Sequence, residues 1–334
     1  MKKDLFNYSN KVIDRNYKVI YYDCTNYFFY TGKSTTMIPS EIKFLNDFEL
    51  KSKNIIVCTD GAMCTDDIKA FNVDEDRGFV ITQSIKRLNK ELKEFALDKS
   101  GWRILGNIKT IYNLEDIESN EELISKYYNT IFYKKMECET KSVVQTLIVT
   151  FSFKYQEYQH KLKTRQLDRA RKTVEEVNKK NKNAKKKKDI EKIKKSHNSN
   201  DPCRFIKRVR TTDDGVVACN INYIIDEEIY KEEEKYNGLY GIATNLIDDT
   251  ETIVKVIKGR WEIEESFRIL KHEFDSGTVY LSNEDRIKVH FVTCYLSLFM
   301  YRFLEHQLED KYTVSEIIAA LQKMILLEHK GKGF

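Results

Sequence analysis

The sequence predicts an α/β fold in which strands and helices alternate near the N-terminus and helices dominate near the C-terminus. Short apolar segments rich in β-branched and aromatic residues alternate with amphipathic segments over residues 1–88. A long polar segment of helical character occupies the middle of the chain, and later segments carry apolar residues every three or four positions. Alternation of this kind is typical of a sheet covered by helices.

The N-terminal part, residues 1–88, holds the first strands and helices of the predicted core. The expected elements are, in order, strand 17–30, helix 39–50, strand 54–59, helix 65–71 and strand 78–82. The first helix is expected because Ile42, Leu45 and Phe48 are spaced three apart. Pro39 suits its first turn, and Thr65 suits the N-cap of the second helix.

Residues 89–236 differ in character and predict an insertion that separates the first part of the core from the second, 237–334. Within the insertion we expect strands at 130–133, 142–151 and 215–225 and a basic helical arm at 154–197. After it we expect a strand at 238–244 and helices at 250–274, 283–308 and 313–327.

Composition excludes several classes of protein. The 334 residues carry 57 Lys and Arg against 52 Asp and Glu, and a net charge of +5 is too small to establish a nucleic-acid partner. The seven cysteines are scattered without a Cys-x-x-Cys pair, which argues against zinc and favours a reduced compartment. No signal peptide is visible, and the longest uncharged apolar stretch, 291–301, is about half a membrane span. We therefore expect a cytoplasmic protein with no membrane partner.

Three carboxylates are candidates for chemistry. Asp23 lies within the first apolar segment, and Asp60 directly follows the segment NIIVCT, where a buried strand emerges at the edge of a sheet. Glu264 shares a helical stripe with Arg268 and Lys271, four and seven residues later. Carboxylates are the hard ligands that Mg²⁺ prefers, and neighbouring cations would bind phosphate.

Each of these features also has a purely structural interpretation. A Glu and an Arg four residues apart on a helix usually form a solvated salt bridge. An aspartate at the end of a strand is commonly a turn residue. The basic arm 154–197 either neutralises DNA phosphates or is a solvated helical arm.

The segment Gly259–Lys271, GRWEIEESFRILK, resembles the C-terminal signature of DDE transposases from bacterial insertion sequences, Tyr-x2-Arg-x3-Glu-x6-Lys. Arg260, Glu264 and Lys271 match it at the right spacing, whereas Ile257 stands at the tyrosine position. The segments YYDCTNYFF and IIVCTDGAM resemble the strands that carry the family's two aspartates, and YNGLYGIATN resembles its return from an insertion. The resemblance implies a ribonuclease H-like mixed sheet flanked by helices and interrupted by an inserted β-rich and long-helix region.

The same resemblance implies a function. Asp23, Asp60 and Glu264 would hold two Mg²⁺ ions, with Mn²⁺ as an alternative, while Arg260, Arg268 and Lys271 would bind DNA. The expected activity is cleavage of a phosphodiester bond at transposon ends and strand transfer to target DNA. A homodimer on double-stranded DNA, associated with the nucleoid, is the expected assembly.

Two departures from the family pattern keep alternatives open. Asp60 follows Asp23 by only 37 positions, which predicts an internal deletion of a hairpin. The family's N-terminal DNA-binding region is expected to be missing or nearly so. A degenerate inactive copy, a ribonuclease H-like nuclease without strand transfer, and a non-catalytic DNA-binding remnant are the alternatives.

Overall fold

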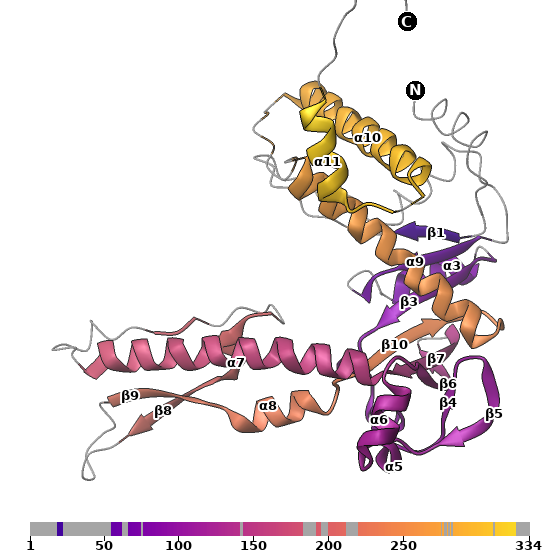
Figure 1. Ribbon diagram of the computed structural model, residues 1–334. Helices are drawn as coiled ribbons and strands as arrows, with labels where there is room; N and C mark the ends of the chain where they lie inside the picture. The colour runs from indigo at the N-terminus through magenta and orange to yellow at the C-terminus, as the bar shows by residue number, and fades with distance from the viewer. Residues whose placement is uncertain are drawn as a thin grey trace, which may run out of the picture. The chain divides into compact units, whose positions relative to one another are not determined.

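The computed structural model describes residues 19–22, 55–61, 66–74, 76–140, 143–182, 192–194, 200–211, 220–274, 276, 279, 281, 283–309 and 311–324. The chain divides into two compact units (Figure 1). The first comprises Met1–Ile81, Thr140–Val143 and Asn245–Phe334, and the second comprises Thr82–Glu139 and Val144–Thr244. None of the helices in the described residues is long and apolar enough to span a bilayer.

The first unit contains a parallel sheet built from β1 (Val19–Tyr22), β2 (Ile56–Thr59) and the start of β3 (Gly78–Gln83). Strand β2 lies between the other two, with Tyr22 opposite Thr59 and Thr59 opposite Ile81. Helix α3 (Asp66–Asp74) connects β2 to β3, as a parallel pair requires. β2 and β3 read as continuous apolar runs because their side chains are buried, and Cys58, Phe79 and Val80 are wholly inaccessible.

Three helices follow in the same unit: α9 (Thr250–Arg268), α10 (Glu284–Gln307) and α11 (Val314–Lys323). Their starts are fixed by side-chain caps from Asp249, Asn283 and Thr313. Helix α9 continues into η5 (Ile269–Glu273), a segment with π-helical pitch. Helices α10 and α11 pack on η5 through an apolar cluster that includes Ile269, Tyr301 and Ile317.

The second unit has a sheet with the strand order β10 (Leu239–Thr244), β7 (Val143–Phe151), β6 (Phe132–Thr140), β4 (Trp102–Ile104) and β5 (Asn107–Tyr112). β10 is antiparallel to β7, and β4 is antiparallel to both of its neighbours. Helices α4 (Lys90–Leu97), α5 (Leu114–Glu118) and α6 (Glu121–Tyr127) each begin with an asparagine cap. Trp102, Phe132 and Phe151 fill the core beneath them.

Helix α7 (Phe153–Lys182) is packed on one side rather than solvated all round. It lies beside the hairpin of β8 (Ile206–Thr211) and β9 (Asn220–Ile225), and beside η4 (Pro202–Phe205) and α8 (Glu227–Glu234) (Figure 1). The shared apolar cluster consists of Leu167, Ala170, Val177, Phe205, Ile206 and Tyr223. Arg204 and Glu233 add a two-pronged ion pair of 3.1 and 3.2 Å between η4 and α8.

The predicted α/β class is confirmed, and the architecture is compatible with a ribonuclease H-like fold. The helix predicted from 154 to 197 is present as α7 up to Lys182, and the prediction is wrong at residues 192–194, which lie in no helix. Residues 183–191 and 195–197 lie outside the described part of the chain. Strand 17–30 is described only at 19–22. Helix 39–50, the cap Thr65 and the expected hairpin deletion lie outside the described residues. The insertion boundaries at 89 and 236 stay a prediction.

Candidate active site

Asp60 stands where β2 ends, in the first unit. Its Oδ1 atom accepts a hydrogen bond of 2.6 Å from the backbone N–H of Gly61, and its side chain is 41% exposed. Strand β1 runs parallel beside β2 and ends at Tyr22, directly opposite Thr59. Asp23 is the next residue in the sequence, but it lies outside the described residues. Two of the predicted carboxylates thus follow neighbouring strands in the chain.

Helix α9 reaches these strand ends because Gly259 allows a close approach. A Cβ atom at position 259 would overlap the hydroxyl group of Tyr21 on β1. Glycine within a helix costs about 1 kcal/mol of stability relative to alanine. The packing of α9 on β1, which only glycine permits at this position, offsets this cost. Ile253, Val254 and Ile257 are buried on the same helix. The close approach sets the position of the residues that follow Gly259.

Arg260, the residue after this glycine, joins two carboxylates from different elements. Its Nη1 atom lies 2.6 Å from Oε1 of Glu264 and 3.7 Å from Oδ1 of Asp60. The arginine side chain is only 14% exposed, whereas Asp60 and Glu264 are 41% and 46% exposed. The structure therefore brings Asp60 and Glu264 together on one cation, and both carboxylates are accessible from solvent.

Two titratable groups beneath the site contribute no charge near neutral pH. Burial raises the pKa of the Cys58 thiol to about 12, against the opposing effect of the Arg260 guanidinium. Burial, together with the neighbouring Cys58 and Glu262, raises the pKa of Tyr21 to about 12. The thiol and the phenol therefore both stay neutral, and neither neutralises the charge of Arg260.

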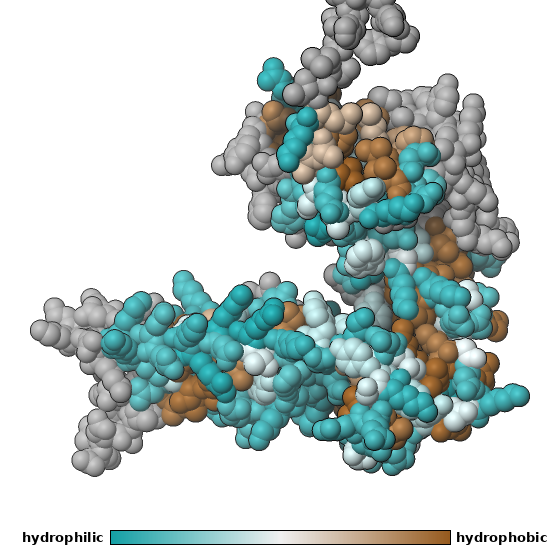
Figure 2. All heavy atoms as spheres, in the orientation of Figure 1, coloured by the Kyte–Doolittle hydropathy of each residue, from teal (hydrophilic) through white to brown (hydrophobic). Residues whose placement is uncertain are grey.

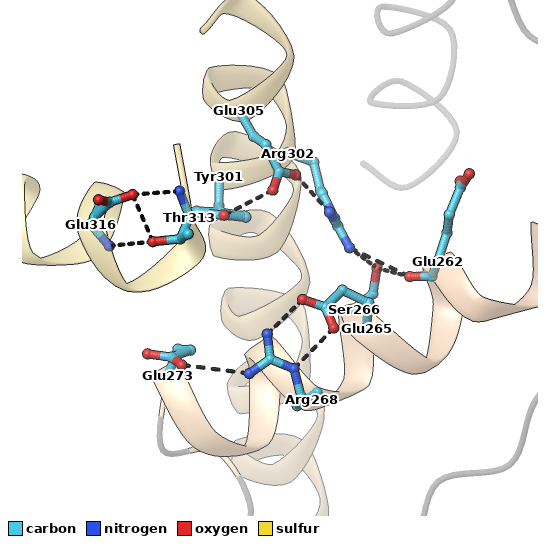
Figure 3. Close-up of polar contacts among 10 residues, drawn as sticks. All are labelled: Glu262, Glu265, Ser266, Arg268, Glu273, Tyr301, Arg302, Glu305, Thr313 and Glu316. Carbon is cyan, nitrogen blue, oxygen red and sulfur yellow. Dashed lines mark hydrogen bonds and ion pairs between the residues drawn. The ribbon is translucent and has the colours of Figure 1, made fainter. Parts of the chain in front are cut away.

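Arg268 does not pair with Glu264, the residue one turn earlier on its stripe. It forms hydrogen-bonded ion pairs of 2.5 and 2.9 Å with Glu265, and it lies 3.8 Å from Glu273 (Figure 3). Its side chain is about half exposed. Any phosphate that binds Arg268 would therefore compete with two carboxylates.

Lys271 lies in η5, where the helical pitch changes. The backbone N–H of Phe274 bonds to the carbonyl of Ile269, and Ser276 closes the segment through two bonds to the carbonyl of Leu270. A π-turn holds one residue more than an α-turn, so Lys271 is rotated away from the position seven residues after Glu264 in an α-helix. The prediction of one continuous α-helical stripe is wrong from Ile269 onward for this reason.

The donors of this site fit a divalent metal ion in their chemistry. Asp60 and Glu264 provide hard carboxylate oxygens, which are accessible and already bind a cation. Within the described residues, no three or more His, Cys, Asp or Glu side chains are grouped so that they could hold a metal. The third expected ligand, Asp23, is not among those residues.

Sequence reasoning missed three residues that position the site. A glycine inside an amphipathic pattern is a signal for close packing, and it could have indicated Gly259. No local signal indicates Tyr21, its partner across the helix–strand contact. Arg302 of α10 donates to the hydroxyl of Ser266 at 3.0 Å and so ties α10 to α9 (Figure 3). Its partner is far away in the sequence, which leaves no pattern to recognise.

Comparison with known proteins identifies a family. A family model described as "Transposase DDE domain" matches residues 31–300, which is most of the chain. The matched span includes Asp60, Arg260 and Glu264 and begins after Asp23. No curated protein and no solved structure matches the chain.

Proposed function

The chain belongs to the family of transposases with a DDE domain, and from this premise we propose that it cleaves phosphodiester bonds at transposon ends and joins them to target DNA. The family implies an enzyme of the nuclease and transferase kind that binds DNA and uses divalent metal ions. The proposal comprises cleavage that depends on Mg²⁺, strand transfer, and the roles of individual residues.

The observation that carries the proposal is the convergence of Asp60 and Glu264. A solvated salt bridge within α9 would account for the contact between Glu264 and Arg260, but it would not recruit Asp60 from the end of β2. A turn aspartate would account for the bond from Gly61, but it would not need a cation from α9. The convergence favours a site over either structural interpretation.

We assign the roles as follows. Asp23, Asp60 and Glu264 hold the metal ions. Asp60 follows β2, and β2 pairs in parallel with β1, the strand that precedes Asp23 in the sequence. Bound Mg²⁺ supplies activation of the attacking oxygen and stabilisation of the charge on the phosphate. Arg260, Arg268 and Lys271 bind the phosphate backbone of the DNA beside the carboxylates.

Helix α7 supplies a second surface that favours DNA. Six exposed cations on it are spaced three, four or seven residues apart, which places them on one face: Lys154, Lys161, Arg165, Arg169, Lys172 and Lys179. The opposite face, with Leu167 and Ala170, packs on the hairpin. Figure 2 shows hydrophilic side chains along α7.

The length of this cationic face matches the dimensions of DNA. At about 1.5 Å per residue, it extends over roughly 38 Å. One turn of B-DNA is roughly 34–36 Å. Lys161 is paired with Glu157, and acidic residues flank the stripe, so the attraction is weaker than the count of cations suggests. We propose that this face contacts the DNA backbone without reading its sequence.

The test is cleavage of a labelled duplex that carries the element's terminal repeat, with Mg²⁺ or Mn²⁺. Glu264→Gln and Asp60→Asn should each abolish cleavage. Glu251→Gln is the matched control, because Glu251 also lies on α9, forms a 2.9 Å pair with Lys255 four residues away, and is equally exposed at 46%. Continued cleavage by Glu264→Gln at the wild-type rate would refute the assignment.

The same assay separates the alternatives. A nuclease without strand transfer would cleave the labelled duplex but would not join it to a target plasmid. A non-catalytic remnant would bind the duplex and leave it intact at every metal concentration. Only cleavage followed by joining supports the full proposal.

A further inference from the structure

We propose that Arg260 is the internal counter-ion of this site, and that a divalent cation must displace its guanidinium from Asp60 and Glu264 in order to bind. The inference rests on the proposed function, because it takes these two carboxylates as metal ligands. It adds a role for Arg260 before DNA arrives.

The guanidinium contacts the two carboxylate groups that a shared metal ion would need. One nitrogen, Nη1, contacts both carboxylates at 2.6 and 3.7 Å. Mg²⁺ requires its oxygen ligands at about 2.0–2.1 Å, which is closer than the guanidinium can approach them. A metal ion held by Asp60 and Glu264 would need the same oxygen atoms, and like-charge repulsion would disfavour the guanidinium beside it.

A second pair on α9 shows that this arrangement is not the ordinary helical salt bridge. Lys255 and Glu251 have the same four-residue spacing, but the lysine is 72% exposed and pairs with a carboxylate of its own helix. Arg260 is 14% exposed and also reaches Asp60 on another element. Arg260 is therefore the buried cation that neutralises these two carboxylates.

Displacement would leave Arg260 available to phosphate. Its backbone is fixed on α9 next to Gly259, which packs on Tyr21, so the guanidinium head stays close to the carboxylates after it leaves them. A DNA phosphate beside the metal is the natural new partner for a planar two-pronged donor. Metal binding and DNA binding would then strengthen each other through the same side chain.

The experiment measures Mg²⁺ binding in the absence of DNA, so that no cleavage enters the result. Calorimetric titration and thermal shift are performed on the full chain at constant ionic strength, set with KCl. Arg260→Gln should melt at a lower temperature without metal and bind Mg²⁺ about three- to ten-fold more tightly than wild type, because the competing cation is gone. Arg260→Lys, which keeps a charge, should lie between them.

Three further variants make the outcomes distinct. Lys255→Gln should leave the affinity for Mg²⁺ unchanged, and Asp60→Asn and Glu264→Gln should abolish binding. If those two variants lose binding while Arg260→Gln binds Mg²⁺ equally or more weakly than wild type, Arg260 positions the ligands and the inference is wrong, although the proposed function stands. If neither the wild type nor any variant binds Mg²⁺, both the proposed metal site and the inference are wrong. Circular dichroism checks that each variant is folded.

Discussion

Replacing Gly259 with alanine should destabilise the protein, although the same exchange usually stabilises a helix. In a helix interior the exchange contributes about 1 kcal/mol in favour of alanine. Here the new Cβ would lie 2.8 Å from Cζ of Tyr21 and closer still to its hydroxyl oxygen. Overpacking of a filled site costs about 1–3 kcal/mol. The two terms give a net loss of about 1 kcal/mol in the free energy of unfolding.

A double-mutant cycle with Tyr21→Val isolates the contact. In the Tyr21→Val background the ring is gone, so Gly259→Ala should become stabilising by about 1 kcal/mol. The coupling between the two positions should be about 1–3 kcal/mol, measured by urea unfolding of all four proteins. If Gly259→Ala has the same effect in both backgrounds, α9 does not rest on β1 at this residue, and the packing that positions Arg260 and Glu264 has another origin.

The same variant should weaken the proposed activity. Relief of the overlap requires α9 to shift, and the shift moves Arg260 and Glu264 away from Asp60. A displacement of about 1 Å in such a site can lower the rate of cleavage roughly 100-fold. Single-turnover cleavage of the terminal-repeat duplex is the measurement, and the Tyr21→Val, Gly259→Ala double variant should recover part of the loss.

Three other predictions concern the second unit. Burial lowers the pKa of Lys134 from 10.5 to about 8 in the folded protein. Between these two pH values the unfolded chain binds a proton that the folded protein has lost, so the free energy of unfolding should rise with pH. Urea unfolding at several pH values should show a smaller rise in Lys134→Met. The double variant Arg165→Gln, Lys172→Gln should weaken DNA binding. It should also reduce the slope of log affinity against log salt concentration by about one for each phosphate that is no longer neutralised. An unchanged slope would exclude this face as a DNA contact. Glu233→Gln removes the partner of a largely buried arginine and should cost about 2 kcal/mol in urea unfolding, whereas the exposed Glu228→Gln should cost almost nothing.

Local patterns were sufficient for much of the fold. The apolar segments at β2 and β3 predicted strands because both faces of these strands are largely buried, which favours apolar residues at successive positions. Helices α10 and α11 begin one residue after the predicted starts at 283 and 313, where Asn283 and Thr313 cap them through bonds to the backbone two or three residues away. Helices α5 and α6 were missed, although their asparagine caps were a usable signal.

The arm 154–197 shows where patterns stop being informative. Its lysines and its helical composition are visible in the sequence. Composition does not decide, however, between a solvated arm and a DNA contact. The structure shows that Leu167, Ala170 and Val177 are buried against a hairpin that begins with Ile206. This packing leaves one face of α7 exposed, and that face carries the cations.

By itself, the sequence determined the α/β order of elements, the strand that precedes Asp60, and the helix that carries Arg260 and Glu264, because each depends on neighbours within a few residues. Tertiary structure alone decided that Arg260 contacts Asp60, that Gly259 rests on Tyr21, and that the helix changes pitch at Ile269. The physical reason is the same for all three: each depends on atoms that are brought together only when α9 packs on the sheet and on α10.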